Sequence, residues 1–192
     1  MLNWIRFATR KNGMRGKLKV LGINGSASQS SSNLAILHAV AKLGKPHFDL
    51  EIIDDLSKLP HFRTELTDDN IPEELIKLRN QIEVADGVIV CTPEYVFSIP
   101  SRLKNAIEWC VSTTVFSDKP TGLITASAQG EKGHEELKLI LQTVQASLAE
   151  DATLLISGVR GKVNKNGDIA DHEIATAVKK LVEAFAELMG EK

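Results

Sequence analysis

The chain has 192 residues, of which 43% are hydrophobic and 25% are charged, and its formal net charge is -2. This length suits one domain with a full core, and the average globular composition gives no indication of a nucleic-acid or strongly acidic partner. No apolar run approaches the roughly 20 residues that a membrane-spanning helix needs, so no membrane span is expected.

The two cysteines, Cys91 and Cys110, lie in apolar segments and lack the spacing of metal ligands. We therefore expect a reduced, cytoplasmic protein rather than a disulfide framework. The histidines show no paired spacing either, so no metal site is predicted.

Residues 1–16 differ in composition from the rest of the chain. They carry several basic residues and no acidic one, and they lack the apolar core of a secretory signal. A second methionine, Met14, precedes the first predicted strand. We expect this basic N-terminal extension to be dispensable and residues 17–192 to form a single domain.

The first half of that domain begins with a buried strand and a loop of small residues. Strands are recognised by apolar or alternating patterns, and helices by apolar residues at helical spacing. The segments expected in this half are, in order, a strand at 18–24, a helix at 33–43, a strand at 48–54 and a helix at 73–84.

The second half continues the alternation. It is expected to contain, in order, a strand at 87–91, a helix at 101–111, a strand at 121–126, a helix at 134–149, a strand at 153–157 and a helix at 172–189. Strands that alternate with helices in this way predict an α/β fold whose parallel sheet is covered by helices on both faces.

The loop at 25–32 leads from the first strand into the first helix. Its small residues let a backbone approach a ligand closely, and hydroxyls such as those of Ser26, Ser28 and Ser32 add hydrogen-bond partners. A helix N-terminus presents free N–H groups and a positive dipole end, which favours phosphate. The same pattern is also typical of an ordinary turn with serine caps, and this loop alone does not decide between the two.

Two further loops leave carboxyl ends of predicted strands, where ligands bind in this class of fold. The loop at 92–100 supplies Pro93, Tyr95 and Phe97, which are suited to pressing on a flat ring. The loop at 127–133 offers backbone N–H groups to the carbonyl oxygens of a planar heterocycle, through Ser127, Gln129 and Gly130. One phosphate site with two ring-contacting loops favours FMN over a dinucleotide.

Three competing signatures are absent. The sequence contains no Walker-type phosphate loop, and its first loop is not the G-x-G-x-x-G of dinucleotide-binding folds. The third predicted strand ends in Thr92-Pro93 rather than in an acidic residue, which argues against a phospho-acceptor receiver domain.

The motifs along the chain resemble those of the NADPH-dependent FMN reductase family, which includes quinone, azo-dye and chromate reductases. The resemblance covers about residues 18 to 187. It is carried by the segments 25–28 (GSAS), 31–33 (SSN), 92–95 (TPEY), 98–100 (SIP) and 103–109 (LKNAIEW).

The resemblance implies a flavodoxin-like three-layer sandwich with a five-stranded parallel sheet in the order 2-1-3-4-5. It implies FMN held non-covalently, often at a dimer interface, and a homodimer or homotetramer. It also implies a hydride that passes from NAD(P)H through the flavin to a quinone-like or other small electron acceptor. Because the cofactor carries the difficult chemistry, no protein acid or base is expected at the hydride step, and no catalytic residue is predicted.

Carried over position by position, Ser26, Ser31 and Asn33 match the phosphate-loop pattern of the family. The loop beside the isoalloxazine ring is matched by Pro93, Glu94 and Tyr95. Ser28 stands where many members have Arg, so the phosphate charge must be met by hydroxyls, N–H groups and the helix dipole.

A second departure lies at the tip of the ring loop. Val96 and Phe97 stand where the family commonly has Asn followed by a variable residue. We expect these two residues to contact the edge of the ring. Because they differ from the family pattern, the nature of those contacts and the substrate preference stay open.

Simpler interpretations accompany these assignments. Tyr95 could pack on a neighbour, Glu94 could cap a helix or bond across subunits, and Lys104 and Asn105 could position a loop. At the level of function, the alternatives are a non-enzymatic flavodoxin-like electron carrier or redox-sensing flavoprotein, and a flavin-free scaffold. Carriers of that type are usually strongly acidic, whereas this chain is close to neutral.

Overall fold

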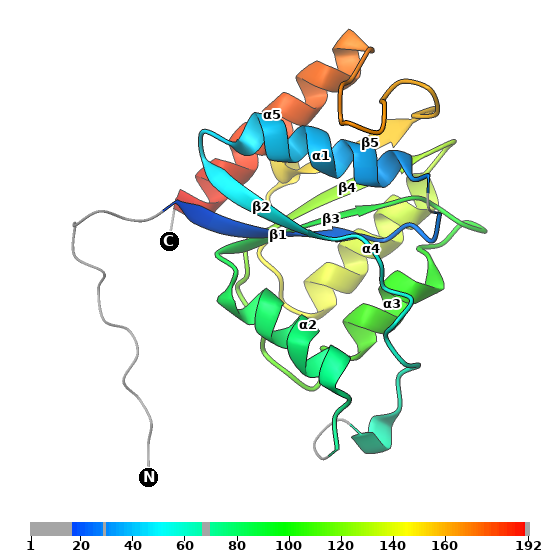
Figure 1. Cartoon of the computed structure of the whole chain (residues 1–192), viewed down its shortest axis with the longest axis vertical. Coiled ribbons are helices and arrows are strands. Elements are labelled where there is room, and N and C mark those ends of the chain that lie inside the picture. The colour runs from blue at the N-terminus through cyan, green and yellow to red at the C-terminus, as the bar shows by residue number, and fades with distance from the viewer. Residues whose placement is uncertain (1–16, 29, 67–69, 191–192) are drawn as a thin grey trace.

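Five parallel strands form one sheet in the order β2-β1-β3-β4-β5 (Figure 1). The computed structural model describes residues 17–28, 30–66 and 70–190. The strands are β1 (Leu18–Asn24), β2 (Phe48–Ile53), β3 (Gly87–Thr92), β4 (Thr121–Ser127) and β5 (Thr153–Ser157). This architecture confirms the predicted α/β class and strand order. The expected basic extension at 1–16 lies outside the described residues.

Helices alternate with the strands along the chain. They are α1 (Ser32–Gly44), α2 (Glu73–Val84), α3 (Ser101–Glu108), α4 (Glu131–Thr143) and α5 (His172–Gly190), with short turns η1 (Thr64–Leu66) and η2 (Glu150–Ala152). None of the helices in the described part of the chain combines the length and the apolar character needed to cross a membrane.

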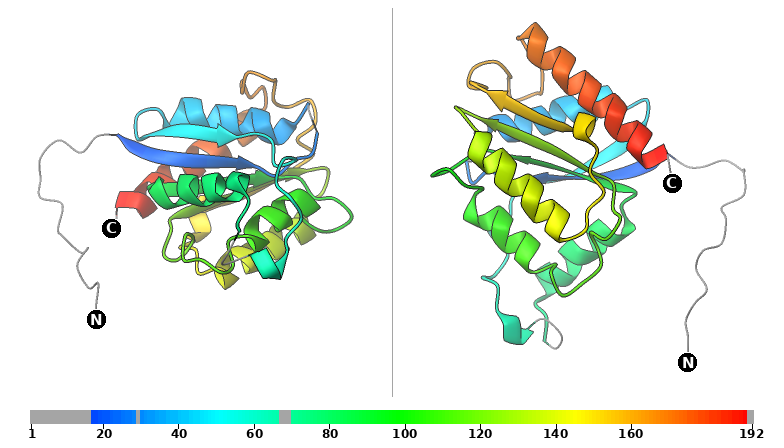
Figure 2. Two further views of the ribbon diagram at one scale, coloured as in Figure 1. Left: turned by 60° about the horizontal axis from the view of Figure 1, so that its bottom comes forward. Right: turned by 180° about the vertical axis from the view of Figure 1, so that it is seen from behind.

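The helices lie in two layers on either side of the sheet, with α1 and α5 on one face and α2, α3 and α4 on the other (Figures 1 and 2). The α1 and α5 layer contains the edge-to-face pair Phe48 and Phe185, whose ring centroids are 5.8 Å apart. In the other layer, Leu103 and Leu137 are fully buried. Because both faces are covered, β3 is buried along its whole length and apolar up to its last residue, Thr92.

The strand order reverses at β1. The chain leaves β1 to build β2 on one side of it and then crosses to β3 on the other, where Asn24 and Cys91 are register partners. The carboxyl ends of β1 and β3 therefore lie side by side at the point where ligands bind in open α/β sheets.

Helix α4 departs from its predicted bounds, beginning at Glu131 rather than at 134 and ending at Thr143 rather than at 149. Gln145 has a positive φ of 63°, which stops the helix. The chain then runs beside the start of β4, where the Thr121 N–H donates to the Ser147 carbonyl over 2.8 Å. The apolar residues that suggested a longer helix still reach the core, since Val144 and Leu148 pack against it.

Helix α3 is also shorter than predicted and ends at Glu108 rather than at 111. The Trp109 carbonyl that follows accepts hydrogen bonds from the Arg79 guanidinium, with Nε at 2.9 Å. A side chain from α2 thus satisfies a carbonyl at the end of α3, and the chain turns away.

Candidate functional site

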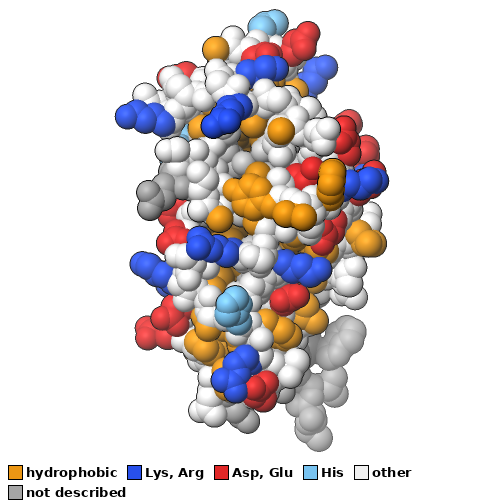
Figure 3. All heavy atoms as spheres, turned by 90° about the vertical axis from the view of Figure 1, so that its right-hand side faces the viewer, with side chains coloured by type: hydrophobic (Ala, Val, Ile, Leu, Met, Phe, Trp, Pro, Cys, Tyr) orange, Lys and Arg blue, Asp and Glu red, His pale blue; other side chains and the backbone are white. Residues whose placement is uncertain are grey.

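The three loops expected to form a site meet at the carboxyl edge of the sheet. The Gly25 N–H donates to the Cys91 carbonyl over 2.8 Å, and the Ser26 hydroxyl lies 3.4 Å from the Tyr95 hydroxyl. From the third loop, the Ser127 hydroxyl donates to the Glu94 carbonyl over 3.4 Å. Figure 3 views this edge and shows hydrophobic side chains gathered near the middle of the face.

The first loop is anchored by a buried asparagine that the sequence analysis did not single out. Asn24 ends β1 with 2% of its surface exposed, accepts from the Ser26 N–H at 3.1 Å and donates to the Asp54 carbonyl at 3.1 Å. Its signal in the sequence is a polar residue at the end of a buried strand. Asn24 thus fixes the direction in which the chain leaves the sheet.

Small residues in this loop serve packing as well as ligand access. A Cβ added at Gly25 would lie 2.6 Å from the Thr92 hydroxyl and 2.8 Å from a Leu103 methyl. Gly25 is therefore required by the close approach of β3 and α3. Beyond it, Ser28 is exposed and its N–H donates to the Ser26 hydroxyl over 3.2 Å.

Ser31 is the N-cap of α1. Its hydroxyl accepts from the N–H groups of Asn33 at 3.2 Å and Leu34 at 3.3 Å. The capping interpretation is thus correct for this residue. Among the described residues, the N–H groups of Ala27 and Ser32 have no acceptor. These donors, near the positive end of the α1 dipole, leave room for an anion.

Asn33 is buried and braces the first turn of α1 against the sheet. Its amide donates to the Ala126 carbonyl over 3.1 Å, and its carbonyl accepts from the Cys91 thiol at 3.4 Å. Both ends of the side chain are therefore engaged within the protein. Burial raises the pKa of the Cys91 thiol, which makes it an inert core residue.

The second loop contains a tight turn at its tip. Tyr95 and Ser98 exchange backbone hydrogen bonds of 2.9 and 3.1 Å, and both residues between them have positive φ, 54° at Val96 and 59° at Phe97. This is the backbone of a type I′ turn, which Asn-Gly favours and a β-branched residue resists. The side chains at its tip are exposed, 96% for Val96 and 70% for Phe97.

Two other residues of this loop face the protein. Pro93 is buried and supports the loop from beneath. The Glu94 carboxylate accepts from the Gly133 N–H in the first turn of α4 at 2.9 Å. The interpretation of Glu94 as a cap of the helix that follows it, α3, is thus not the one observed, because its carboxylate bonds the first turn of α4 instead. A Cβ at Gly133 would lie only 3.2 Å from that of Glu94.

Two carbonyl groups of the third loop accept hydrogen bonds from the end of β5 and the residue after it. The Ser127 carbonyl accepts from the Gly158 N–H at 2.9 Å, and the Gln129 carbonyl accepts from the Ser157 hydroxyl at 2.9 Å. No acceptor for the N–H groups of Ala128 and Gln129 occurs in the described ranges. Gly130 precedes α4 with a φ of 108°, and a Cβ there would meet Leu155 at 2.9 Å.

Glu136 of α4 is a residue of this region that the sequence analysis missed. One carboxylate oxygen accepts from the Ser98 hydroxyl at 2.6 Å and from the Ile99 N–H at 3.0 Å, and the other lies 3.7 Å from the Lys104 ammonium. Burial of the carboxyl raises its pKa, but these hydrogen bonds and the Lys104 charge outweigh burial and leave the pKa below its usual value. The sequence signal that could have identified Glu136 is its position in α4, three residues after Gly133 and next to Leu137, on the part of the helix that faces the protein.

Asn105, which was expected to bond the backbone of the ring loop, instead positions the segment at 60–62 together with Trp109. The Pro60 carbonyl accepts from the Asn105 amide at 2.9 Å and from the Trp109 indole at 2.8 Å, and the Asn105 carbonyl accepts from the Phe62 N–H at 2.8 Å. These contacts fasten the connection between β2 and α2.

His134, in the first turn of α4, lies beside β4. Its Nδ1 is 3.0 Å from the Thr125 hydroxyl. Burial, assisted by the positive charge of Lys138, lowers the pKa of His134 below its usual value. In the part of the chain that the structure describes, no three His, Cys, Asp or Glu side chains gather as a metal site requires.

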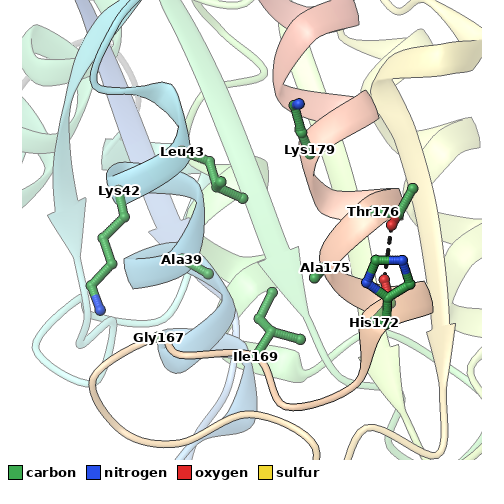
Figure 4. Close-up of a pocket in the computed structure, with 9 residues that line it drawn as sticks. All are labelled: Ala39, Lys42, Leu43, Gly167, Ile169, His172, Ala175, Thr176 and Lys179. Carbon is green, nitrogen blue, oxygen red and sulfur yellow. Dashed lines mark hydrogen bonds between the residues drawn. The ribbon is translucent and has the colours of Figure 1, made fainter.

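A groove of about 480 Å³ lies away from these loops, where α1 and α5 face one another across the segment at 167–169 (Figure 4). Its floor includes Leu43, Ile169 and Ala175, and Lys42 at its rim forms an ion pair of 2.5 Å with Asp168. None of the predicted site residues lines it.

Comparisons with known proteins agree with this geometry. The family model of NADPH-dependent FMN reductases matches residues 18–160. The chain is 32% identical over 180 residues to the NADH:(hydroxy)cinnamate reductase subunit CrdA of Vibrio ruber, covering 90% of this chain and 86% of that one. It is 26% identical to a quinone reductase of Escherichia coli, covering 92% and 97%. The solved structure of FerB, an NAD(P)H:(acceptor) oxidoreductase of Paracoccus denitrificans, superposes with a TM-score of 0.74 at 25% identity, covering 91% and 98%.

Proposed function

Because this chain belongs to the NADPH-dependent FMN reductase family, we propose that it is an NAD(P)H-dependent oxidoreductase that binds FMN non-covalently and reduces a quinone-like or other small acceptor. The observation that carries the proposal is the meeting of an anion-binding loop and an aromatic loop at the switch point of the sheet, joined by the contact of Ser26 with Tyr95. The quinone reductase among the relatives supports this class of acceptor.

The first loop fits a phosphate group. The unpartnered N–H groups of Ala27 and Ser32 and the hydroxyls of Ser26 and Ser28 would hold it, assisted by the dipole of α1. Among the described residues, no hydrogen bond joins a Lys or Arg side chain to residues 26–28 or 30–33. The phosphate charge would therefore be balanced by dipoles and hydroxyls.

The other two loops fit a flat ring system. Tyr95 is 41% exposed and Phe97 more so, and both offer apolar ring surface at the site. The N–H groups of Ala128 and Gln129 would donate to ring carbonyl oxygens and favour negative charge there. Pro93, which is buried, would act by shaping the loop, and Asn33 by placing the helix.

FMN, when bound, accepts a hydride from the reduced nicotinamide and passes electrons to the acceptor. The chain's own residues bind and orient the reactants and supply no proton at the hydride step. The carboxylates of Glu94 and Glu136 are both engaged in hydrogen bonds to backbone N–H groups, which suits a structural role.

The test is to release and identify any flavin from the purified protein, add FMN if none is bound, and follow NAD(P)H oxidation with and without a quinone. We expect bound FMN and quinone-dependent oxidation of NADH or NADPH. A colourless protein that does not take up added FMN would reject the proposal.

A second candidate is delivery of electrons to a protein partner, and it is favoured by the Vibrio ruber relative, which is named as a subunit of a reductase. The protein would then be an electron carrier, which is the flavodoxin-like alternative named in the sequence analysis. Rapid oxidation of NAD(P)H by quinone in the isolated chain would favour the enzyme. Slow turnover that a protein acceptor accelerates would favour the carrier.

We also propose a cytoplasmic homodimer or homotetramer. The cytoplasmic assignment is supported by Cys91 and Cys110, which are both free and buried rather than joined in a disulfide. The oligomer is proposed from the family resemblance, and light scattering of the FMN-loaded protein tests it.

A further inference from the structure

The turn at the tip of the ring loop is strained and needs support from outside itself. Non-glycine residues pay conformational energy at positive φ, and they do so at both Val96 and Phe97. The side chains of these two residues are exposed, so they make little packing contact that could hold the turn. Within the loop, only the paired backbone bonds of Tyr95 and Ser98 close it among the described residues.

The C-terminal end of the turn is supported by a side chain on a different element. The Glu136 carboxylate binds the hydroxyl of Ser98, the last residue of the turn, and the N–H of Ile99, the next residue. Hydrogen bonds to a charged acceptor are about twice as strong as neutral ones, and this carboxylate is only 28% exposed. Lys104, on α3, lies beside its second oxygen, so the group is fixed from two sides.

Tyr95 opens the same turn and depends on its geometry. Its N–H and carbonyl are both bonded to Ser98, and its hydroxyl reaches Ser26 in the first loop. A displacement of Ser98 would therefore be transmitted to the Tyr95 ring and to the spacing between the two loops.

We propose that Glu136 is a positioning residue of the flavin site, which holds the strained 95–98 turn through Ser98 and Ile99 and so places the Tyr95 ring. This inference rests on the proposed function for its consequence, flavin binding. The placement of the Tyr95 ring by Glu136 concerns the protein without ligand and does not depend on the proposed function.

The chain provides a specific probe, because Tyr95 is its single tyrosine. Biosynthetic incorporation of a fluorinated tyrosine gives one fluorine NMR signal, which reports the environment of this ring alone. The full-length protein is compared with Glu136→Ala, Glu136→Gln and Glu135→Ala. The last is the matched control, because Glu135 precedes Glu136 in α4, is 65% exposed and, among the described residues, forms its ion pair with Lys132.

Glu136→Ala is expected to shift or broaden the Tyr95 signal and to weaken FMN binding about tenfold, because it removes both charge-assisted hydrogen bonds that hold the turn. Glu136→Gln keeps an oxygen acceptor without the charge, so its signal and FMN affinity should lie between those of the wild type and Glu136→Ala. Glu135→Ala should match the wild type in both measurements.

The outcomes separate this inference from the proposed function. If Glu136→Ala lowers the melting temperature but leaves the Tyr95 signal and the FMN affinity of the wild type, Glu136 is merely structural and the inference is wrong. If the wild type fails to bind FMN while the Tyr95 signal still depends on Glu136, the positioning role stands and the proposed function fails.

Discussion

At the scale of single residues, Val96 adopts a positive φ, a backbone conformation that its β-branched side chain disfavours. Asparagine adopts a positive φ more readily than a β-branched residue does. The Val96 side chain is almost fully exposed, so its replacement removes little packing. The strain at this position can therefore be measured by substitution.

Val96→Asn is expected to raise the free energy of unfolding by about 1 kcal/mol, because it relieves unfavourable backbone geometry without loss of buried contacts. Urea unfolding followed by circular dichroism provides the measurement. Val84→Asn is the control, since Val84 is also exposed but lies in a regular helix. Equal effects at both positions would contradict strain at Val96.

At the scale of elements, α1 presents its N-terminus to the proposed phosphate site. Ser31 caps it, and donors of the adjoining loop remain available. The acid-free first turn of α1 avoids repulsion of a bound phosphate. Dipoles and hydroxyls would thus determine the affinity of the site for an anion.

Ser28→Arg is expected to tighten FMN binding about threefold at low salt, because an exposed cation adds a modest attraction to the phosphate. The gain should shrink as salt screens the pair. Fluorescence titration of FMN over a range of salt concentrations measures it, with Ser28→Gln as a long but neutral control. An equal gain in Ser28→Gln would show that charge is not the cause.

The contact of α4 with β4 gives the fold a dependence on pH. The folded protein lowers the pKa of His134 below the usual 6.5, so it favours the neutral imidazole. Stability from this group is therefore present above about pH 6.5 and is lost as the pH falls toward the lowered folded pKa.

His134→Gln should reduce the loss of unfolding free energy between about pH 8 and about pH 5.5, because glutamine can still bond Thr125 and does not take up a proton. Urea unfolding at the two pH values measures the difference. His47→Gln, at an exposed position, controls for the change of residue type. A wild-type pH dependence in His134→Gln would refute this origin.

Much of the element order could be predicted from the sequence, since periodicity reports which face of each element is buried. The end of α4 could not, because Val144 and Leu148 keep an apolar spacing while the backbone reverses at Gln145. The turn at 96–97 carries no glycine or asparagine to indicate it. The contacts of Glu136 join residues far apart in the chain, and local patterns do not encode such pairs.

At the scale of the whole molecule, one sheet positions every predicted site residue, and the described domain has its own core on each face. We propose that residues 1–16 are not needed for that domain. Deletion of residues 1–16 should leave the melting temperature and the FMN affinity unchanged, as thermal unfolding and fluorescence titration would show. A substantial loss in either quantity would assign the segment a role in stability or binding.

The ring loop and α4 are fastened to each other in both directions, by Glu94 from the loop and by Glu136 from the helix. The two residues at the tip of the turn take no part in this fastening through their side chains. Substitutions at positions 96 and 97 that keep the positive φ of the turn should therefore leave these two attachments in place. A directed library confined to these two codons would vary the exposed tip of the loop while its attachments to α4 are retained.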